Sequence, residues 1–342
     1  MIPTTMRASV LVERHKIELQ ERPVPRPAAD EVLVQVRSVG VCGSDVHYYQ
    51  DGRIGDLVVT GPLVLGHEVS GVIVDVGADV PADRVGERVA IEPQRPCRRC
   101  RHCKTGRLNL CAQMEFFATP PIDGAFCDYV VCPADFAHPV PDALSDHAAA
   151  LLEPFSVGIW ACTKARVAPG SRVLVSGAGP IGALAAMAAR AFGASEVIVT
   201  DLVESRRERI LGFGATSAFD PRDEAFDAAA LLADAFIECS GATPAVLTGL
   251  AALRGGGVAV LVGLGSESMS LPVQQIMTKE ITVTGVFRYV DTWPTAMAAA
   301  RRPDIDLAGL VTAEYPLEEA EAALTSDAGP RSMKSVVVVS RA

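Results

Sequence analysis

The sequence predicts an α/β fold in which a doubly wound parallel sheet is joined to a β-rich domain. Three observations lead to this prediction. At 342 residues the chain is too long for one ordinary core, so about two domains are expected. Up to about residue 150 it shows short alternating runs broken by Gly and Pro, which is typical of strands. From Ser145 onward, apolar runs alternate with Ala-rich amphipathic segments, as expected where strands and helices follow one another.

In the first part of the chain, strands are predicted and helix signals are weak. The clearest strands are Glu31–Val36, Val69–Val76 and Arg88–Ile91. Ser145 then has the side chain to cap a helix that runs through His147–Ala150.

In the second part, the predicted strands are apolar runs without clear alternation, because strands buried on both faces of a parallel sheet show this pattern. The runs are Arg172–Ser176, Glu196–Thr200, Phe236–Cys239, Val258–Val262 and Ile281–Val286. Amphipathic segments such as Ile181–Phe192 and Ser205–Leu211 separate them. The strand-like Ser335–Ser340 is expected to return to the first domain.

Composition and charge argue against several classes of protein. A hydrophobic fraction of 49% indicates a large buried interior, and a formal charge of −10 repels a nucleic-acid backbone overall. No apolar stretch reaches the roughly 18 residues that span a bilayer, and Met1–Arg14 lacks the apolar run of a secretory signal. Nine cysteines without such a signal favour a reducing compartment. A cytoplasmic protein without a membrane partner is therefore expected.

Four cysteines form the most informative motif. Cys97, Cys100, Cys103 and Cys111 follow the spacing C-x2-C-x2-C-x7-C. Four thiolates on one loop can surround Zn²⁺ at about 2.3 Å and leave no position for substrate, so a structural zinc is predicted. Disulfides are one alternative. Because residues 95–111 hold six Lys and Arg and no acidic residue, a nucleic-acid zinc ribbon is another, which the acidic chain opposes.

A glycine-rich turn predicts a dinucleotide site. Gly177-Ala178-Gly179-Pro180-Ile181-Gly182 follows an apolar strand and opens a helix, so a pyrophosphate would meet free N–H groups at the helix N-terminus. Asp201 ends the next strand, 19 positions after Gly182. Its carboxylate can accept both ribose hydroxyls and would repel a 2′-phosphate, so NAD is predicted rather than NADP. Arg206 is interpreted as covering the adenine or ribose, although an Arg can also hold a 2′-phosphate.

A second metal site is predicted from Cys42, His67 and Glu68, which supply thiolate, imidazole and carboxylate. Three protein ligands suffice for a catalytic zinc, which keeps one position open. Glu153 offers a further carboxylate from far along the chain. Asp45 is expected to hold the second nitrogen of His67 and fix its tautomer.

These motifs, in this order, resemble the zinc-dependent medium-chain dehydrogenase/reductase family, and within it the polyol branch that contains sorbitol and xylitol dehydrogenases. The resemblance covers essentially the whole chain, and its most specific segments are Cys42–Tyr48, Phe116–Pro121 and Phe287–Tyr289. Alcohol dehydrogenases of the same superfamily usually have a cysteine where this chain has Glu153. A carboxylate there resembles the polyol enzymes.

The resemblance implies a GroES-like catalytic domain over residues 1–155, with the zinc lobe at about residues 95–112, and a Rossmann domain over residues 156–287. The segment 288–342 would return to the catalytic domain, and the active site would lie in the cleft between the domains. One catalytic and one structural Zn²⁺ per subunit are expected.

The resemblance also assigns roles to individual residues. Cys42, His67 and Glu68 take the positions of the catalytic zinc ligands, and Glu153 that of a carboxylate reaching the zinc directly or through water. The residues expected to line a polyol pocket are Tyr48, Phe117, Glu153, Arg288 and Tyr289. The residues expected to bind NAD are Gly177, Gly179, Pro180, Ile181, Gly182, Asp201, Arg206, Val262, Gly263, Leu264, Val286, Phe287 and Arg288.

The expected reaction is the oxidation of a secondary alcohol to a ketose. Zinc would lower the pKa of the alcohol, and a hydride would pass to C4 of the nicotinamide. Ser44 is expected to carry the proton away and His47 to pass it to solvent, with capping or bracing of a helix as the alternative role. Arg288 and Tyr289 would pair the remaining hydroxyls, with a structural ion pair as the alternative for Arg288.

The sequence therefore predicts an NAD-dependent dehydrogenase that acts on xylitol, D-sorbitol or a related polyol. Three alternatives remain open: an L-threonine 3-dehydrogenase-like zinc enzyme, an NADPH-dependent reductase without catalytic zinc, and a non-catalytic zinc protein that binds nucleic acid. A homo-oligomer is expected, either a tetramer by analogy with the polyol branch or a dimer paired through the strand near Val283.

Overall fold

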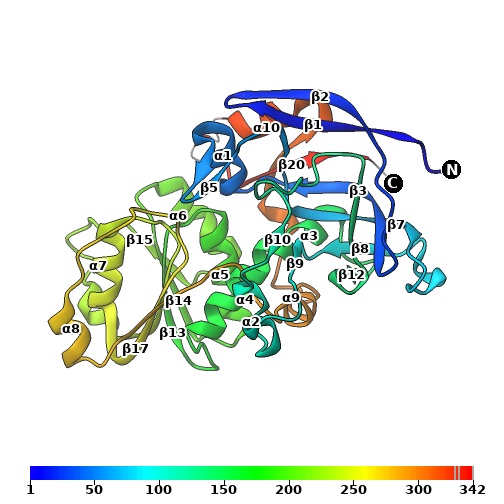
Figure 1. Ribbon diagram of the computed structural model, residues 1–342. Coiled ribbons are helices and arrows are strands. Elements are labelled where there is room, and N and C mark those ends of the chain that lie inside the picture. The colour runs from blue at the N-terminus through cyan, green and yellow to red at the C-terminus, as the bar shows by residue number, and fades with distance from the viewer. Residues whose placement is uncertain (327–328, 330–331, 341–342) are drawn as a thin grey trace. The chain divides into compact units, whose positions relative to one another are not determined.

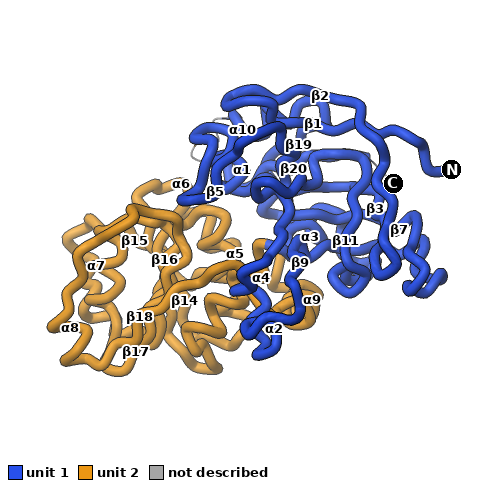
Figure 2. Tube along the Cα trace, viewed as in Figure 1, with its two compact units in different colours: residues 1–153, 307–328, 332–342 blue, residues 154–306, 329–331 orange. Residues whose placement is uncertain are grey.

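The computed structural model describes residues 1–326, 329 and 332–340 of the chain. It divides into two compact units, which Figure 2 shows in different colours. Unit 1 comprises residues 1–153, 307–328 and 332–342, and unit 2 comprises residues 154–306 and 329–331.

Unit 1 is built around a seven-stranded sheet with the order β12-β8-β7-β3-β20-β19, in which β11 also pairs with β3 (Figure 1). Its strands are β3 (Glu31–Gly40), β7 (Glu68–Val76), β8 (Arg88–Ile91), β11 (Tyr129–Pro133), β12 (Ala137–Pro139), β19 (Val311–Pro316) and β20 (Lys334–Val338). The C-terminal strand β20 lies antiparallel to β3 and pairs Val336 with Gly40. The end of the chain is therefore part of the same sheet as the N-terminal residues.

Smaller sheets complete the strands of unit 1. One has the order β2-β1-β6, and two pairs join β10 with β9 and β4 with β5. Their bounds are β1 (Thr5–Glu13), β2 (Lys16–Pro23), β4 (Arg53–Ile54), β5 (Leu57–Val58), β6 (Leu63–Val64), β9 (Gln94–Arg95) and β10 (Glu115–Phe116). The core consists largely of β-branched side chains from β1, β3 and β7, such as Val10, Val34 and Ile73, which suit a half-buried pleated surface.

Unit 1 also contains several short helices. They are α1 (Gly43–Asp51), α2 (Arg101–Lys104), α3 (Asp146–Ala150) and α10 (Ala320–Thr325), and α4 (Leu152–Lys164) begins at its end. The predicted cap is present, because the Ser145 hydroxyl accepts a hydrogen bond from the Ala148 N–H at 3.2 Å.

Unit 2 contains a six-stranded, fully parallel sheet with the order β15-β14-β13-β16-β17-β18 (Figure 1). Its strands are β13 (Arg172–Ser176), β14 (Glu196–Thr200), β15 (Ser217–Phe219), β16 (Ala233–Glu238), β17 (Leu253–Leu261) and β18 (Thr282–Gly285). Its helices are α5 (Pro180–Ala191), α6 (Glu204–Ile210), α7 (Thr243–Ala252), α8 (Val273–Thr278) and α9 (Trp293–Ala299). This doubly wound order confirms the predicted fold class.

The predicted strands Arg172–Ser176 and Glu196–Thr200 coincide with β13 and β14. The strand β17 instead begins at Leu253, five residues before the predicted start. Near its start, residues Arg254 to Gly256 are exposed and Gly255 to Gly257 are all glycine, so no apolar run marks this part of the strand in the sequence. Among the described residues, no helix is long and apolar enough to cross a membrane.

Candidate metal centre and dinucleotide site

Unit 1 brings together the three residues predicted to hold a catalytic metal. Cys42 lies at the start of α1, and His67 and Glu68 lie where the chain enters β7. One ligand atom from each of Cys42, His67 and Glu68 lies within 4.8 Å of the others. His67 and Glu68 are buried, whereas Cys42 is half-buried, so the cluster forms a partly enclosed set of sulfur, nitrogen and oxygen donors.

Two glycines make room for this cluster. Gly66 has a φ of +87°, and a Cβ there would lie 2.6 Å from the Phe126 ring, so only glycine places His67 in this turn without a clash. A Cβ at Gly40 would lie 1.9 Å from Oε2 of Glu68. The absence of a side chain at Gly40 is therefore what allows the Glu68 carboxylate to lie over β3.

Asp45 fixes the backbone of both ligand segments. Its Oδ2 accepts a hydrogen bond from the Cys42 N–H at 3.0 Å, and its Oδ1 accepts one from the Gly66 N–H at 2.9 Å. Nδ1 of His67 lies 3.7 Å from Oδ1, which is too long for the expected hydrogen bond to the imidazole. Asp45 is fully buried and thus orients the metal ligands mainly through their main chain.

Lys334, which the sequence did not single out, contacts the cluster from the C-terminal strand. Its Nζ donates a hydrogen bond to Oε1 of Glu68 at 2.5 Å, and both side chains are buried. The other oxygen of Glu68, Oε2, is buried and has no hydrogen-bond partner. A buried carboxylate oxygen without a donor fits a position that faces a cation.

The charges around the cluster favour a cation as well. Burial by itself lowers the pKa of His67. The negative charges of Asp45 and Cys42 together raise this pKa by more than burial lowers it, so the pKa lies well above its ordinary value. Burial likewise lowers the pKa of Lys334, while Glu68, Cys42 and Glu153 raise it above the ordinary value. The donor set and this negative potential both fit Zn²⁺.

The four cysteines of the predicted structural site converge in unit 1. Sγ–Sγ distances are 3.5 Å for Cys100–Cys103, 3.9 Å for Cys100–Cys111 and 4.0 Å for Cys97–Cys103. The edge of a tetrahedron with Zn–S bonds of 2.3 Å is about 3.75 Å, so the four sulfurs already have the spacing of a zinc site. Backbone N–H groups of Arg99 and Cys100 lower the pKa of the Cys97 thiol to about 6, which favours the thiolate.

In unit 2, the glycine-rich turn connects β13 to α5. A Cβ at Gly182 would lie 1.8 Å from the Gly177 carbonyl oxygen, so the helix packs against the turn as closely as only glycine permits. Asp201 follows β14, and its Oδ2 accepts a hydrogen bond from the Ala178 N–H at 2.8 Å. Nε of Arg206 is buried without a hydrogen-bond partner. The acidic residue and the phosphate-binding turn are therefore neighbours, as a dinucleotide site requires.

Comparison with known proteins agrees with this geometry. The alcohol dehydrogenase GroES-like domain matches residues 28–142, and the zinc-binding dehydrogenase domain matches residues 180–302. The chain is 43% identical to sorbitol dehydrogenase from Gallus gallus, over 94% of this chain and 93% of that protein. It is 41% identical to probable D-xylulose reductase A from Aspergillus terreus, over 96% of each. The structure of L-idonate 5-dehydrogenase from Escherichia coli superposes with a TM-score of 0.92 at 31% identity, over 98% of each chain.

The chain belongs to the zinc-dependent medium-chain dehydrogenase/reductase family. This relationship confirms the resemblance that the sequence motifs indicated, and it makes the protein a dehydrogenase. The β-rich unit 1 and the parallel sheet of unit 2 are the GroES-like and Rossmann parts of such an enzyme.

The proposed proton relay of the dehydrogenase lies on α1. Ser44 is half-buried in the first turn of this helix. His47 is about half exposed, and its Nδ1 lies 3.0 Å from Oδ2 of Asp51. The two residues are three positions apart and thus share one side of the helix.

The predicted substrate residues fall in different environments. Tyr48 is buried in the core of unit 1, and Glu153 is buried in the first turn of α4 outside the three-residue cluster. In unit 2, the Arg288 guanidinium lies 4.8 Å from the centre of the Phe287 ring, and Tyr289 is fully buried 6.4 Å from Trp293. Their roles toward a polyol stay predictions.

The remaining predicted cofactor residues of the dehydrogenase follow β17 and β18. Val262 and Gly263 are half-buried after β17, whereas Leu264 is 66% exposed. Val286 and Phe287 follow β18, and Phe287 is 55% exposed. All of these segments lie at the carboxyl ends of parallel strands, the edge at which open α/β sheets bind ligands.

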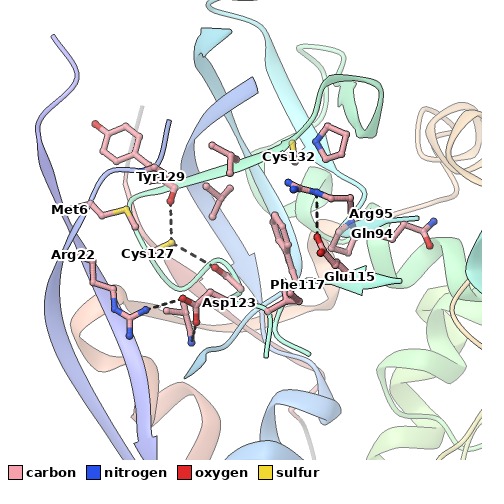
Figure 3. Close-up of a pocket in the computed structure, with 18 of the residues that line it drawn as sticks. Met6, Arg22, Gln94, Arg95, Glu115, Phe117, Asp123, Cys127, Tyr129 and Cys132 are labelled. Atoms are coloured by element: carbon pink, nitrogen blue, oxygen red, sulfur yellow. Dashed lines mark hydrogen bonds and ion pairs between the residues drawn. The ribbon is translucent and has the colours of Figure 1, made fainter. Parts of the chain in front are cut away.

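Unit 1 of the dehydrogenase also contains a cavity of about 490 Å³, shown in Figure 3. It lies among Met6, Gln94, Phe117, Cys127 and other side chains, with the Arg22–Asp123 ion pair at its border. Phe117 is the one predicted substrate residue among the described residues that line it. Neither metal cluster contributes to it, so this cavity is separate from the candidate metal centre.

Proposed function

We propose that this dehydrogenase is an NAD-dependent polyol dehydrogenase that oxidises a secondary hydroxyl of xylitol, D-sorbitol or a related polyol to the ketose. The observation that carries the proposal is the partly enclosed Cys42–His67–Glu68 cluster, a three-ligand set of the kind that leaves one position for substrate. It occurs in a chain related over nearly its whole length to sorbitol dehydrogenases.

Cys42, His67 and Glu68 would hold the catalytic zinc, and the bound metal would supply the Lewis acidity that lowers the pKa of an alcohol. Asp45 keeps the Cys42 and His67 segments in place through its two backbone hydrogen bonds. Lys334 compensates part of the negative charge by its ion pair with Glu68. We assign Glu153 to a water-mediated contact, because its carboxylate lies outside the three-residue cluster.

The released proton would leave through α1. Ser44 accepts the proton from the substrate hydroxyl and passes it on, and His47, which is half exposed, delivers it to solvent. Arg288 and Tyr289 would bind the other hydroxyls of the polyol. This role distinguishes the proposed polyol dehydrogenase from an L-threonine dehydrogenase.

NAD is the proposed cofactor, because Asp201 places a carboxylate beside the glycine-rich turn where a 2′-phosphate would be repelled. A structural zinc would occupy the four-cysteine site. Two Zn²⁺ ions per subunit are therefore proposed, one for catalysis and one for the lobe.

We also propose a homo-oligomer, as a tetramer that contains a dimer paired through β18. This strand forms one edge of the six-stranded sheet. On the preceding helix α8, Val273 and Met277 are 62% and 71% exposed, which suits a covered apolar surface. Light scattering of the wild type and of Met277→Glu tests this arrangement, and an unchanged mass in the variant would contradict it.

The cytoplasm is the proposed location. All nine cysteines are free thiols, as expected in a reducing compartment, and five of them belong to the two candidate metal clusters. A small polyol or ketose is the proposed partner, with no nucleic acid and no membrane.

The experiment that tests this function is NADH formation from NAD⁺ on xylitol, D-sorbitol, ribitol, galactitol, L-threonine and ethanol. Turnover of one or two polyols supports the proposal. Turnover confined to L-threonine would replace the substrate assignment and leave the metal and the cofactor standing. No turnover of any of these compounds by protein with two bound zincs would contradict the proposal.

A further inference from the structure

Three turns lie against one another at the carboxyl end of the central strands in unit 2. They are residues 177–182 after β13, residues 239–242 after β16 and residues 262–265 after β17, here named the first, second and third turn. A Cβ at Gly177 would lie 3.2 Å from the Ser240 nitrogen, and a Cβ at Gly263 would lie 2.3 Å from the Gly241 nitrogen. The turns therefore meet backbone to backbone.

The side chain of Glu238 joins the end of β13, from which the first turn starts, to the second turn. This residue ends β16 and is 1% exposed. Its Oε1 accepts hydrogen bonds from the Ser176 hydroxyl at 3.2 Å, the Ser240 hydroxyl at 2.5 Å and the Ser240 N–H at 2.7 Å. The Gly241 N–H lies 2.9 Å from Oε1 and 3.1 Å from Oε2. One carboxylate thus holds the end of β13 and the whole start of the second turn.

The main chain of Glu238 joins the second turn to the third. Its carbonyl oxygen accepts hydrogen bonds from the N–H groups of Val262 and Gly263, both at 2.9 Å. In addition, a Cβ at Gly263 would lie 2.9 Å from Oε2 of Glu238, so the third turn packs directly on the carboxylate. The second and third turns therefore both bind this one residue, and its carboxylate also binds Ser176 at the end of β13.

Stability of the sheet does not explain a carboxylate at this position. The other residues near the end of β16, Phe236 and Ile237, are fully buried apolar side chains, and burying a carboxylate costs free energy unless donors surround it. The donors that surround Glu238 belong to the turns and not to the strands beside it, apart from the Ser176 hydroxyl. The carboxylate therefore shapes the turns.

The position of these turns indicates which part of a dinucleotide they would meet. The strand order changes direction between β13 and β16, and a doubly wound sheet binds a dinucleotide across this point, one half on each side. Asp201 and the first turn lie on the β13–β14 side, which receives the adenosine half. The second and third turns lie on the β16–β17 side.

We propose that Glu238 is a positioning residue for the nicotinamide half of NAD, acting through the second and third turns. The inference rests on the proposed use of NAD and adds a residue that sets the geometry of the cofactor. Because the two turns are already ordered before the cofactor binds, binding of the nicotinamide half loses less conformational entropy. Loss of the carboxylate should therefore weaken the binding of NADH more than the binding of a ligand that lacks the nicotinamide ring.

The test compares NADH with ADP-ribose, which lacks the nicotinamide, on zinc-loaded full-length protein. NADH binding is followed by its fluorescence and ADP-ribose binding by calorimetry. Glu238→Ala is expected to raise the Kd for NADH by about tenfold or more, and the Kd for ADP-ribose by less than about threefold. Glu238→Gln retains an oxygen for Oε1 and should restore most of the NADH affinity, whereas Glu238→Asp, one methylene shorter, should not.

Asp234 provides a matched control on the same strand. It lies near the amino end of β16 and accepts hydrogen bonds from the Arg172 N–H at 2.8 Å and from Arg254 Nε at 2.6 Å. Asp234→Ala removes a hydrogen-bonded carboxylate from the other end of β16 and should leave the ratio of the two Kd values unchanged.

Equal weakening of NADH and ADP-ribose in all Glu238 variants, or no weakening in any of them, would overturn the inference. If Glu238→Ala does not fold, Glu238→Asp and Glu238→Gln decide the question by the same ratio. Failure of the wild type to bind NADH would overturn the proposed NAD use itself, and the two failures are thereby distinguished.

Discussion

Lys334 and Glu68 form a buried ion pair, with Nζ 2.5 Å from Oε1, between residues 266 positions apart in the chain. Lys334 begins the C-terminal strand β20, and Glu68 is one of the three candidate metal ligands. The second oxygen of Glu68 has no hydrogen-bond partner. One oxygen of the Glu68 carboxylate thus pairs with Lys334, and the other is left for a cation at the candidate metal centre.

Lys334→Ala should destabilise the metal-free protein more than the zinc-loaded protein. Without the lysine, Glu68 is a buried charge lacking its cation, a change that typically costs about 3–5 kcal/mol, and bound Zn²⁺ would compensate part of it. The free energy of unfolding in urea, measured with chelator and with zinc, checks this difference. Lys334→Arg keeps the charge and is the control. Equal destabilisation of both forms would contradict the shared role.

Gly40→Ala should weaken metal binding at the catalytic site and spare the four-cysteine site. Its Cβ would lie 1.9 Å from Oε2 of Glu68, so the carboxylate must move. Gly43→Ala is the matched control, because a Cβ at Gly43 meets nothing within 4 Å. Zinc content after dialysis against a weak chelator is expected to fall from two ions to one per subunit in Gly40→Ala alone. Two retained ions would show that Glu68 does not need this space.

Cys103→Ala should remove the structural zinc. Cys103 is buried and its sulfur lies 3.5 Å from that of Cys100. Because a structural zinc contributes directly to folding, the variant should bind one zinc per subunit and unfold at a lower temperature. Cys132→Ala removes an equally buried thiol from β11, outside both clusters, and should retain two zincs. A Cys103→Ala protein with two zincs would argue against the four-thiolate site.

Asp201→Ser should shift the cofactor preference toward NADP. The carboxylate accepts a hydrogen bond from the glycine-rich turn, and Arg206, five positions along the chain, has a buried Nε without a hydrogen-bond partner. The ratio of kcat/KM for NADP to that for NAD is expected to rise by about tenfold or more. Asp220→Asn changes another carboxylate that follows a strand of the same sheet, β15, and should leave the ratio unchanged. An unchanged ratio in Asp201→Ser would contradict the role of Asp201.

Tyr49→Phe should lower stability in a pH-dependent manner. The Tyr49 hydroxyl donates a hydrogen bond to Glu321 at 2.8 Å, and burial followed by this contact raises its pKa from 10.0 to about 12. A raised pKa contributes stability that is complete below pH 10 and is lost as the pH rises toward 12. The variant should therefore be less stable than the wild type by about 1–2 kcal/mol at pH 8, a difference that shrinks above pH 10. A difference independent of pH would refute the contribution of the neutral hydroxyl.

Much of the fold could be predicted because burial leaves a clear trace in the sequence. The strands Arg88–Ile91, Arg172–Ser176 and Glu196–Thr200 were located to the residue, since each is a short apolar run in a buried sheet. The start of β17 was missed because Arg254–Gly257 carries no apolar side chain; Leu253 pairs with Ala233, and regular pairing resumes only at Val258 after an irregularity in the register.

The residues of the candidate site that belong to local sequence motifs could be predicted. Both metal clusters consist of residues whose donor types and spacing indicate zinc. Lys334 and Gly40 carry no such signal, because their contact with Glu68 exists only once β20, β3 and β7 pair. Glu238 does leave a trace, an acidic residue at the end of a buried apolar strand, but its partners lie on turns whose approach the sequence does not reveal.

The most direct test of the central claim is polyol oxidation as a function of bound zinc. Protein stripped with chelator is reloaded stepwise, and NADH formation from the best polyol is measured beside the zinc content of the wild type and of Cys42→Ser. We expect wild-type activity to rise with the second zinc per subunit, and Cys42→Ser to keep one zinc and remain inactive. Full activity in the zinc-free wild type or in Cys42→Ser would contradict a catalytic zinc at Cys42, His67 and Glu68.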